Sequence, residues 1–508
     1  MKLKRSFYNL FFNILSQIVT FSLGIILPRL FLTNLGSEVN GLVSSVGQIF
    51  ACVGLLEAGI GVTTIQALYK PISQNDKIGI NRILAASQKD YIRIGSIYTV
   101  CVAGVAVLYP FIVQSEISRW QVVAVVLFTG IGNAINFLLQ QNYVVLLSAE
   151  GKGYVITNLN LIVNILVNIT KAILLMQGHD IVVVTASQLI ITLLRIILLR
   201  VYLKKEYDWL DFSVEPNYEA LSKRKYVLVQ QLSYFVYSNT DIIILTAFCD
   251  LKVVSVYTIY NLVIGMIEGV ISAFSSSVVF ALGLLYNEDK SRFKKIFEIF
   301  DAGYMTLVFA CFTVTYIAML PFLQLYTKGI SDINYLDEKL AFLFVFLKMI
   351  ATLRSQSQNA INFAGHFKET QKSAVGEMMI NLIVTIVGVI TIGIYGALFG
   401  SIVATMYRGI FVTNYVNKNI LKNSKKECKK KYLHWSINLG LFAIISFIGK
   451  QVVVSVENYI QLIEIMIPCT ILTMLIYFGV LLIEKPMFVK EICGFIKGKF
   501  RGRGQGNR

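Results

Sequence analysis

The sequence has little charge for its length, and this shortage excludes an ordinary soluble protein. Asp, Glu, Lys and Arg together make up 15% of the 508 residues, whereas hydrophobic residues make up 56%. The mean hydropathy is +0.67. A soluble chain has about 25% charged residues because its surface faces water. The composition therefore indicates an integral membrane protein.

Cysteine and histidine are also scarce, which limits the chemistry that the chain can perform. Its 7 cysteines include no closely spaced pair, and its 3 histidines lie far apart in the sequence. This spacing indicates neither a disulfide framework nor a zinc site. The sequence also lacks the phosphate loop Gly-x-x-x-x-Gly-Lys-Ser/Thr, which excludes an ABC-type ATPase in this chain. We therefore expect no metal site and no organic cofactor.

Long uncharged runs are what the sequence does contain. Several reach the roughly 18 to 20 residues that a helix needs to cross the hydrocarbon. We predict an all-α integral membrane protein with about fourteen transmembrane helices. Their expected ranges are 7–32, 39–65, 92–114, 120–147, 154–176, 181–203, 225–248, 253–283, 297–326, 338–364, 371–393, 396–418, 434–454 and 460–483.

Basic residues in the expected loops support this topology. Lys and Arg gather in every second loop, which places the N- and C-termini in the cytoplasm. The same loops account for the net charge of +17. Because the inner leaflet is anionic, we expect these segments to meet membrane lipid, and we expect no nucleic acid partner.

A short internal repeat predicts two similar halves. The sequence from Asn160 to Ile165 returns with one change from Asn381 to Ile386. Two lobes of six helices, related as a parallel pseudo-repeat, and two additional helices would explain it. We expect a first lobe at 1–205, a cytoplasmic linker at 206–222, a second lobe at 223–420, a basic cytoplasmic loop at 421–433, the two C-terminal helices at 434–484 and a basic cytoplasmic tail at 485–508.

Charged residues inside the expected spans are the candidates for a functional site, because an unpaired charge in lipid is costly. Arg354 and Arg408 lie deep in their spans, Lys348 lies close to Arg354, and Arg29 lies near a span end. Guanidinium groups grip phosphate through paired hydrogen bonds. These cations predict a wet, cationic cavity between two lobes that receives an anionic cargo. Structural pairing between helices is the alternative.

Carboxyl and amide groups complete the set of candidates. They are Asp241, Glu57, Glu377, Asn13, Gln17, Asn164 and Asn168, and Lys171 and Arg195 are further cations within expected spans. The carboxylates either neutralise the cations or bind a coupling ion, H⁺ or Na⁺. The amides recur at helical spacing and predict polar stripes on the helices. Pro28 predicts a kink in the first helix, which would act as a gate.

Several stretches carry a resemblance to a known family. They are Leu-Gly-Ser-Glu-Val-Asn-Gly-Leu at 35–42, Gly-Leu-Leu-Glu-Ala-Gly-Ile-Gly at 54–61, Ser-Asn-Thr-Asp-Ile-Ile-Ile-Leu at 238–245, Ala-Gly-His-Phe-Lys-Glu-Thr-Gln-Lys at 364–372, and Tyr407-Arg408. With them the whole chain resembles the polysaccharide repeat-unit flippases (Wzx-like oligosaccharide flippases) of the multidrug/oligosaccharidyl-lipid/polysaccharide (MOP) superfamily. That superfamily shares its fold with the multidrug and toxin extrusion (MATE) exporters and the lipid II flippases.

The resemblance implies a transporter of the bacterial plasma membrane. Its cargo would be an undecaprenyl-diphosphate-linked oligosaccharide, moved from the inner to the outer leaflet by alternating access. The product would serve capsule, O-antigen or exopolysaccharide assembly. A polysaccharide polymerase and glycosyltransferases would then be partners.

Other activities are alternatives to this prediction. A MATE-type multidrug exporter would need an acidic cavity for cationic drugs, and the deep arginines argue against it. A lipid II flippase of the same fold would carry a related lipid-linked cargo. A membrane glycosyltransferase or polymerase would need a long external loop with catalytic carboxylates, but the longest expected one runs only from Thr327 to Asp337. We therefore predict a transporter that is not an enzyme.

Overall fold

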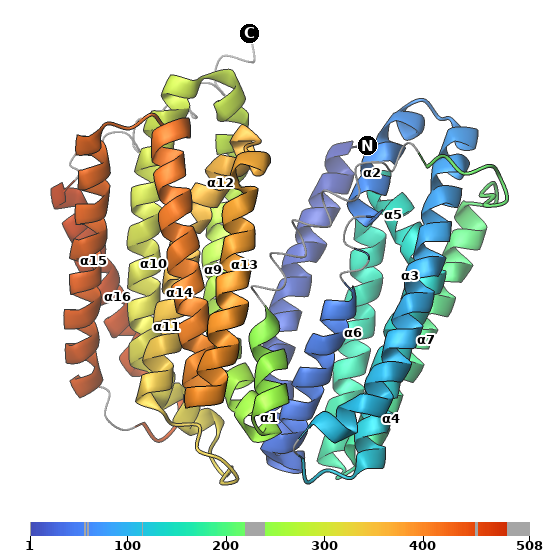
Figure 1. The fold of residues 1–508 in the computed structure, drawn as a ribbon, viewed down its shortest axis with the longest axis horizontal. Helices are drawn as coiled ribbons and strands as arrows, with labels where there is room; N and C mark the ends of the chain where they lie inside the picture. Colours follow the sequence, from blue (N-terminus) through green and yellow to red (C-terminus); the bar gives the residue numbers. More distant parts are fainter. Residues whose placement is uncertain are drawn as a thin grey trace. The chain divides into compact units, whose positions relative to one another are not determined.

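The structure is a computed structural model that describes residues 2–54, 57, 60–113, 115–218, 239–452 and 456–484. Every regular element within these ranges is helical, which confirms the predicted all-α class (Figure 1). Among the described residues, 11 helices are long and apolar enough to cross a membrane. The chain is therefore a multi-pass membrane protein.

The chain divides into two compact units. Unit 1 comprises Met1–Leu262, Gly329–Asn334 and Met378–Gly400, and unit 2 comprises Val263–Lys328, Tyr335–Glu377 and Ser401–Arg508. Three helices contribute residues to both units: α9 (Leu251–Glu288), α13 (Phe367–Ile392) and α14 (Ile394–Tyr415).

The remaining helices of unit 1 come from the first half of the sequence. They are α1 (Lys2–Gly54), α2 (Ile60–Ser73), α3 (Lys77–Ile112), α4 (Arg119–Leu139), α5 (Gln141–Ala149), α6 (Gly153–Met176), α7 (Ile181–Glu206) and the short apolar helix Asn239–Phe248. Apolar side chains of α1, α3 and α4 form a buried core that includes Leu42, Val46, Tyr98 and Val126. Burial of these side chains holds the helices together where they face protein.

The remaining helices of unit 2 come from the second half. They are α10 (Lys290–Tyr326), α11 (Glu338–Leu353), α12 (Ser355–Ala364), the π-helical turn η3 (Val416–Ile420), α15 (Lys425–Val452) and α16 (Tyr459–Glu484). α10 packs against α11, α15 and α16 (Figure 1). Polar contacts join α10 to the last two helices: Asp301 to Lys431 at 2.7 Å and Thr313 to Tyr477 at 2.8 Å.

Aspartate residues begin several helices in both units. Asp76, Asp180, Asp289 and Asp337 precede α3, α7, α10 and α11, and each carboxylate accepts a hydrogen bond from a backbone N–H in the first turn. These N–H groups have no partner within the helix, so a carboxylate at the cap satisfies them and complements the helix dipole. The sequence thus marks these helix starts locally.

The break in α1 lies at Gly36 rather than at Pro28. Gly36 has φ 83°, which is unfavourable for residues that carry a Cβ, whereas Pro28 lies inside the continuous first part of the helix. The Ser37 N–H and hydroxyl, directly after the break, donate to the Asp332 carboxylate at 2.8 and 2.7 Å. The break therefore falls at Gly36, between the expected spans 7–32 and 39–65, and the start of the second part of the helix is capped from a distant loop. The kink at Pro28 stays a prediction.

The expected spans 371–393 and 396–418 leave a short turn between them, and the structure confirms a turn between α13 and α14 at Gly393, which has φ 59°. Beyond the turn the two helices almost touch. A Cβ on Gly396 would lie 2.0 Å from the Gly388 carbonyl carbon, and a Cβ on Gly400 would lie 2.4 Å from the Thr385 hydroxyl oxygen. Only glycine fits at these crossings, as in other membrane helix pairs that pack through small residues.

The predicted spans agree closely with the observed helices. Eleven of the fourteen each coincide with one membrane-length helix of the described residues. The other three, at 7–32, 39–65 and 225–248, fall on α1 and on stretches that include residues outside the described ranges. The total of fourteen stays a prediction, and so does the division into lobes, linker, loop and tail.

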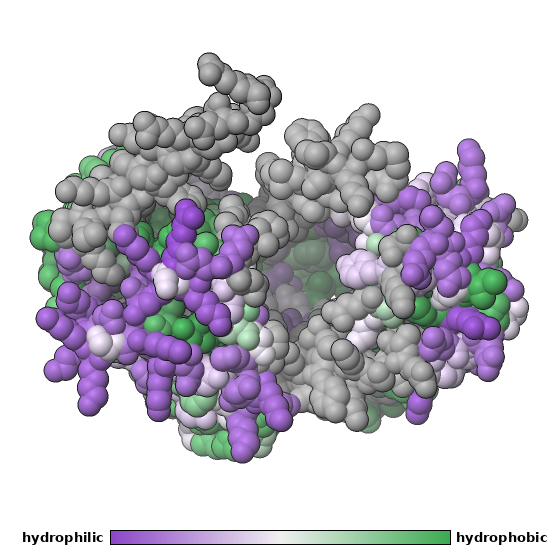
Figure 2. Space-filling model, turned by 90° about the horizontal axis from the view of Figure 1, so that it is seen from above, coloured by the Kyte–Doolittle hydropathy of each residue, from purple (hydrophilic) through white to green (hydrophobic). Residues whose placement is uncertain are grey.

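In unit 2, hydrophilic residues gather at the end of the helices where α10 and α15 begin (Figure 2). Exposed basic residues at this end include Lys290, Arg292, Lys425 and Lys426. Along α7 and α16, by contrast, exposed residues such as Ile197 and Ile467 are apolar. An apolar belt with a basic rim at one end is the surface expected of a protein that spans lipid.

Candidate functional site

Three charged residues that the sequence singled out meet inside unit 2. Arg354, between α11 and α12, forms an ion pair with Glu377 of α13 through its Nη1. The second oxygen of the Glu377 carboxylate lies 3.8 Å from Nε of Arg408 on α14. We call these three residues the charged cluster. It contains two positive charges and one negative charge, so one positive charge is in excess.

Polar groups around Arg408 hold its guanidinium in place. Nη1 donates to the Thr370 carbonyl at 2.9 Å and to the Ser373 hydroxyl, and Nη2 donates to Gln358 Oε1 at 3.4 Å. Arg408 is only 6% exposed, and Glu377 is 7% exposed. Because these donors and acceptors are satisfied by protein, the Arg408 side chain is oriented before any ligand arrives.

The close approach of α13 and α14 explains why these side chains can meet. Gly376 directly precedes Glu377, and a Cβ at Gly376 would lie 2.9 Å from the Tyr407 hydroxyl oxygen. Tyr407 in turn directly precedes Arg408. Glycine therefore lets the two helices come near enough for the carboxylate of one to reach the guanidinium of the other.

Lys348, the third cation that the sequence analysis assigned to the cargo site, also lies in unit 2. It lies on α11, and its Nζ is 3.7 Å from Glu268 Oε2 on α9. Both side chains are partly exposed, at 25% and 34%. This ion pair is therefore more exposed than the ion pairs of the charged cluster, and Lys348 retains surface that a ligand can reach.

The other predicted carboxylates lie in unit 1 and have neutral partners. Asp241 is buried, and its Oδ2 accepts a hydrogen bond from the Tyr257 hydroxyl at 2.8 Å. Glu57 Oε1 accepts from the Tyr91 hydroxyl at 3.4 Å and from Gln141 Nε2. Both carboxylates therefore accept hydrogen bonds from neutral side chains.

The remaining predicted residues lie on two helices of unit 1. Arg29 is half-buried on α1, which also contains Asn13 and Gln17, whose side chains lie outside the described part of the chain. Asn164 and Asn168 lie on successive turns of α6, and Asn168 Nδ2 donates to the Asn164 carbonyl at 2.7 Å. The structure does not test whether any of them contacts cargo.

Sequence reasoning missed the groups that hold Arg408. Ser373 and Glu377 are four residues apart and so lie on one face of α13, which is a signal that the sequence did contain. The role of Gln358 had no such signal, because its helix is a short element after the irregular step at Arg354. Among the described residues, no group of three or more His, Cys, Asp or Glu side chains could hold a metal ion.

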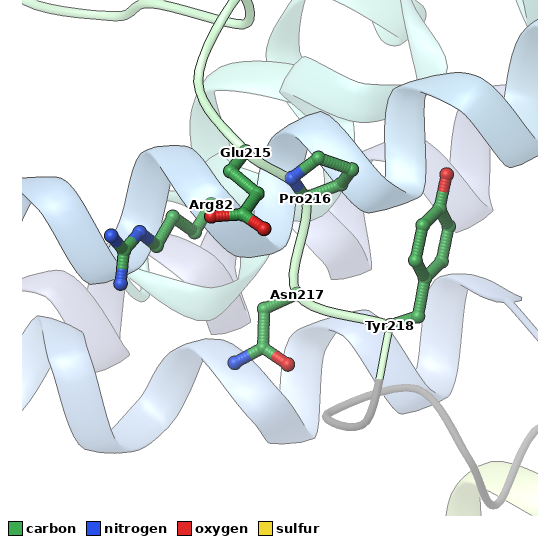
Figure 3. A pocket seen from close by; sticks show the side chains of 5 residues that line it. All are labelled: Arg82, Glu215, Pro216, Asn217 and Tyr218. Carbon is green, nitrogen blue, oxygen red and sulfur yellow. The ribbon is translucent and has the colours of Figure 1, made fainter.

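A separate pocket of about 360 Å³ lies in unit 1 (Figure 3). Arg82 of α3 and the segment Glu215–Tyr218 line it, and the Asn217 N–H donates to the Arg82 carbonyl at 3.1 Å. Its charged side chains are one cation and one carboxylate. This balance does not select a ligand of either sign.

Comparison with solved structures identifies the fold. The chain is similar to the lipid II flippase MurJ in an inward closed conformation, with TM-score 0.70 and 14% identity over 93% of this chain and 99% of that one. An inward-facing MATE family multidrug resistance transporter of the MOP superfamily gives TM-score 0.61 at 16% identity, over 80% and 96%. A MOP superfamily transporter from Pyrococcus furiosus Vc1 gives TM-score 0.53 at 16% identity, over 81% and 94%.

These likenesses show that the chain has the fold of the MOP-superfamily transporters. No family model matches the sequence, and no curated protein matches it significantly. At these identities the structural relatives establish the fold alone, so the cargo must be argued from the residues.

Proposed function

We propose that the protein is a flippase that moves an undecaprenyl-diphosphate-linked oligosaccharide from the inner to the outer leaflet of the bacterial plasma membrane. The product would enter capsule, O-antigen or exopolysaccharide assembly. Glycosyltransferases would supply the cargo, a polymerase would use it, and both chain termini would lie in the cytoplasm. Alternating access remains the expected mechanism.

The charged cluster is the observation that carries this proposal. Two guanidinium groups contact one carboxylate, so the three side chains of the cluster together carry one positive charge. A diphosphate supplies the missing negative charge, and guanidinium matches phosphate oxygens through paired N–H donors. A cationic drug would be repelled by the same excess charge, which disfavours the multidrug exporter.

Cargo binding at the cluster would exchange one anion for another. In the absence of cargo, Glu377 pairs with Arg354 and lies close to Arg408. When a diphosphate approaches, it competes with Glu377 for the two cations, and protonation of Glu377 would favour the cargo. This competition links cargo binding to the proton, and Asp241 and Glu57 are the other carboxylates proposed for ion coupling.

A lipid II flippase is the second candidate function. Its favouring observation is the likeness to the lipid II flippase MurJ, which covers nearly the whole of both chains. Both candidates share a polyprenyl diphosphate, so the charged cluster suits either one. They differ in the saccharide, and cells can distinguish them.

Complementation in two bacterial strains tests the proposal. One strain lacks its polysaccharide repeat-unit flippase, and the other is depleted of its lipid II flippase. We expect wild-type protein to restore surface polymer in the first strain and not growth in the second. Arg354→Gln and Arg408→Gln, expressed at equal levels, should fail to restore the polymer.

Matched controls decide the interpretation. Arg200→Gln removes an exposed cation from α7 in unit 1 and should restore the polymer as wild type does. Rescue of only the depleted strain would replace the proposal with lipid II transport. Resistance to cationic drugs without rescue of either strain would support the exporter instead.

A further inference from the structure

An arginine in unit 1 lies among amide groups rather than carboxylates. Arg195 lies on α7 inside the membrane-length stretch Ile181–Leu203. Its Nη1 donates to Asn160 Oδ1 at 2.9 Å, and its Nη2 donates to Asn136 Oδ1 at 2.5 Å and to Gln140 Oε1 at 2.9 Å. We call these four residues the amide-held arginine site.

The charge of Arg195 is not neutralised by its partners. Amide oxygens accept hydrogen bonds but carry no net charge, and no described carboxylate lies within 4.0 Å of its guanidinium nitrogens. Its Nε is buried without a hydrogen-bond partner. Arg354 and Arg408 differ, because both share the carboxylate of Glu377.

Arg195 has N–H groups that its amide partners do not use. A guanidinium has five N–H groups, and three are used by the three amide oxygens. Because each amide oxygen faces Arg195, the NH₂ groups of Asn136, Asn160 and Gln140 are directed elsewhere, and Gln140 Nε2 has no partner. A phosphate has negative charge and several acceptor oxygens. It therefore suits both the charge of Arg195, which its partners do not neutralise, and the N–H groups that they leave unused.

We propose that the amide-held arginine site binds the phosphate of a membrane lipid or of the lipid-linked cargo, as a second phosphate site within unit 1. The assignment to cargo rests on the proposed flippase function. Phosphate would supply the negative charge that the site lacks, and the amide groups would keep the guanidinium oriented when the site is empty.

The line of amides on α6 favours the cargo over an ordinary phospholipid. Asn160 is followed by Asn164 and Asn168 at intervals of one helical turn, about 6 Å apart along the helix axis. Side-chain amides donate and accept hydrogen bonds, as sugar hydroxyls do. A saccharide attached to a phosphate at Arg195 could therefore contact the same helix.

A purely structural role is the competing explanation, because Arg195 also links α4, α6 and α7. The variant Asn160→Asp separates the two roles. It places a carboxylate oxygen where Asn160 Oδ1 lies 2.9 Å from Nη1. If Arg195 only links helices, this charge-assisted contact should strengthen the link. The same carboxylate fills the anion site from within, so it should prevent phosphate binding.

Binding is measured with a purified triple variant, Arg354→Gln, Glu377→Gln and Arg408→Gln, in which all three side chains of the charged cluster are replaced by neutral ones. The probe is undecaprenyl diphosphate, and phosphatidylglycerol is the second ligand, both in nanodiscs of phosphatidylcholine. In this background, Arg195→Gln should raise the Kd for undecaprenyl diphosphate at least tenfold. Asn160→Asp should do the same without lowering the Tm.

Arg200→Gln is the matched control, since it removes an exposed cation from the same helix and should change the Kd less than twofold. Equal effects of Arg195→Gln and Arg200→Gln, or wild-type binding by Asn160→Asp, would overturn the site. Equal weakening of phosphatidylglycerol and undecaprenyl diphosphate would keep the site but reject the assignment to cargo.

The two proposals fail in different ways. If single Arg354 and Arg408 variants lose transport while Arg195→Gln and Asn160→Asp transport and bind normally, the flippase stands and the second site is wrong. If Arg195→Gln weakens phosphatidylglycerol binding but wild-type protein rescues neither strain, the site stands and the flippase is wrong.

Discussion

Replacing Glu377 with Gln should destabilise the protein more than removing either arginine that it contacts. Glu377→Gln removes the carboxylate that both arginines contact, whereas Arg354→Gln or Arg408→Gln leaves that carboxylate in contact with the other arginine. At the 3.8 Å separation of Glu377 and Arg408, Coulomb attraction is about 4 kcal/mol at an effective dielectric constant of about 20. Measured costs of breaking buried pairs are about 3 to 5 kcal/mol.

The assay is thermal unfolding of purified variants in one detergent. With an unfolding entropy of about 2 cal/mol/K per residue, a loss of about 4 kcal/mol lowers the Tm of 508 residues by about 4 °C. Each arginine variant should lose less than about half of this amount. Glu268→Gln is the matched control, because its contact with Lys348 is partly exposed and should cost about 1 kcal/mol or less. A smaller loss for Glu377→Gln than for both arginine variants would refute the reasoning.

Three further predictions concern helix packing, helix capping and an ion pair between helices. Gly376→Val should cost about 1 to 3 kcal/mol by forcing α13 away from Tyr407, and Tyr407→Ala in the same chain should restore part of the lost Tm. Asp332→Ala removes both hydrogen bonds to Ser37 at the Gly36 break and should cost about 1 to 3 kcal/mol, whereas an unchanged Tm would show that the cap is dispensable. Asp301→Asn leaves Lys431 without its carboxylate between α10 and α15 and should cost about 3 kcal/mol, and Lys431→Met in addition should recover stability.

Much of the fold could be predicted from the sequence because membrane helices carry a strong local signal. Eleven expected spans coincide with described helices, since lipid demands long apolar runs and internally satisfied backbones. The turn at Gly393 was also predictable from its glycines. The break at Gly36 falls between the expected spans 7–32 and 39–65, but the sequence gives no sign of the Asp332 cap that stabilises the new helix start.

The site was predictable residue by residue but not as an arrangement. Depth in an expected span drew attention to Arg354, Arg408 and Glu377 separately, because charges in lipid are rare. Which charged side chains meet depends on how closely α13 and α14 pack. Gly376 permits the close contact with Tyr407, but the sequence does not show that these two helices are neighbours. The amide partners of Arg195 come from two stretches of sequence, Asn136 with Gln140 and Asn160, and no spacing connects these stretches to each other or to Arg195.

The most direct test of the account is transport of a fluorescent polyprenyl-diphosphate oligosaccharide into the outer leaflet of proteoliposomes under an imposed ion gradient. Wild-type protein should move the cargo, Arg408→Gln should fall to the rate of protein-free vesicles, and Arg408→Lys should lie between them because it keeps the charge but loses the paired donors. Wild-type transport by correctly folded Arg408→Gln would contradict the claim that the charged cluster holds the phosphate of the cargo.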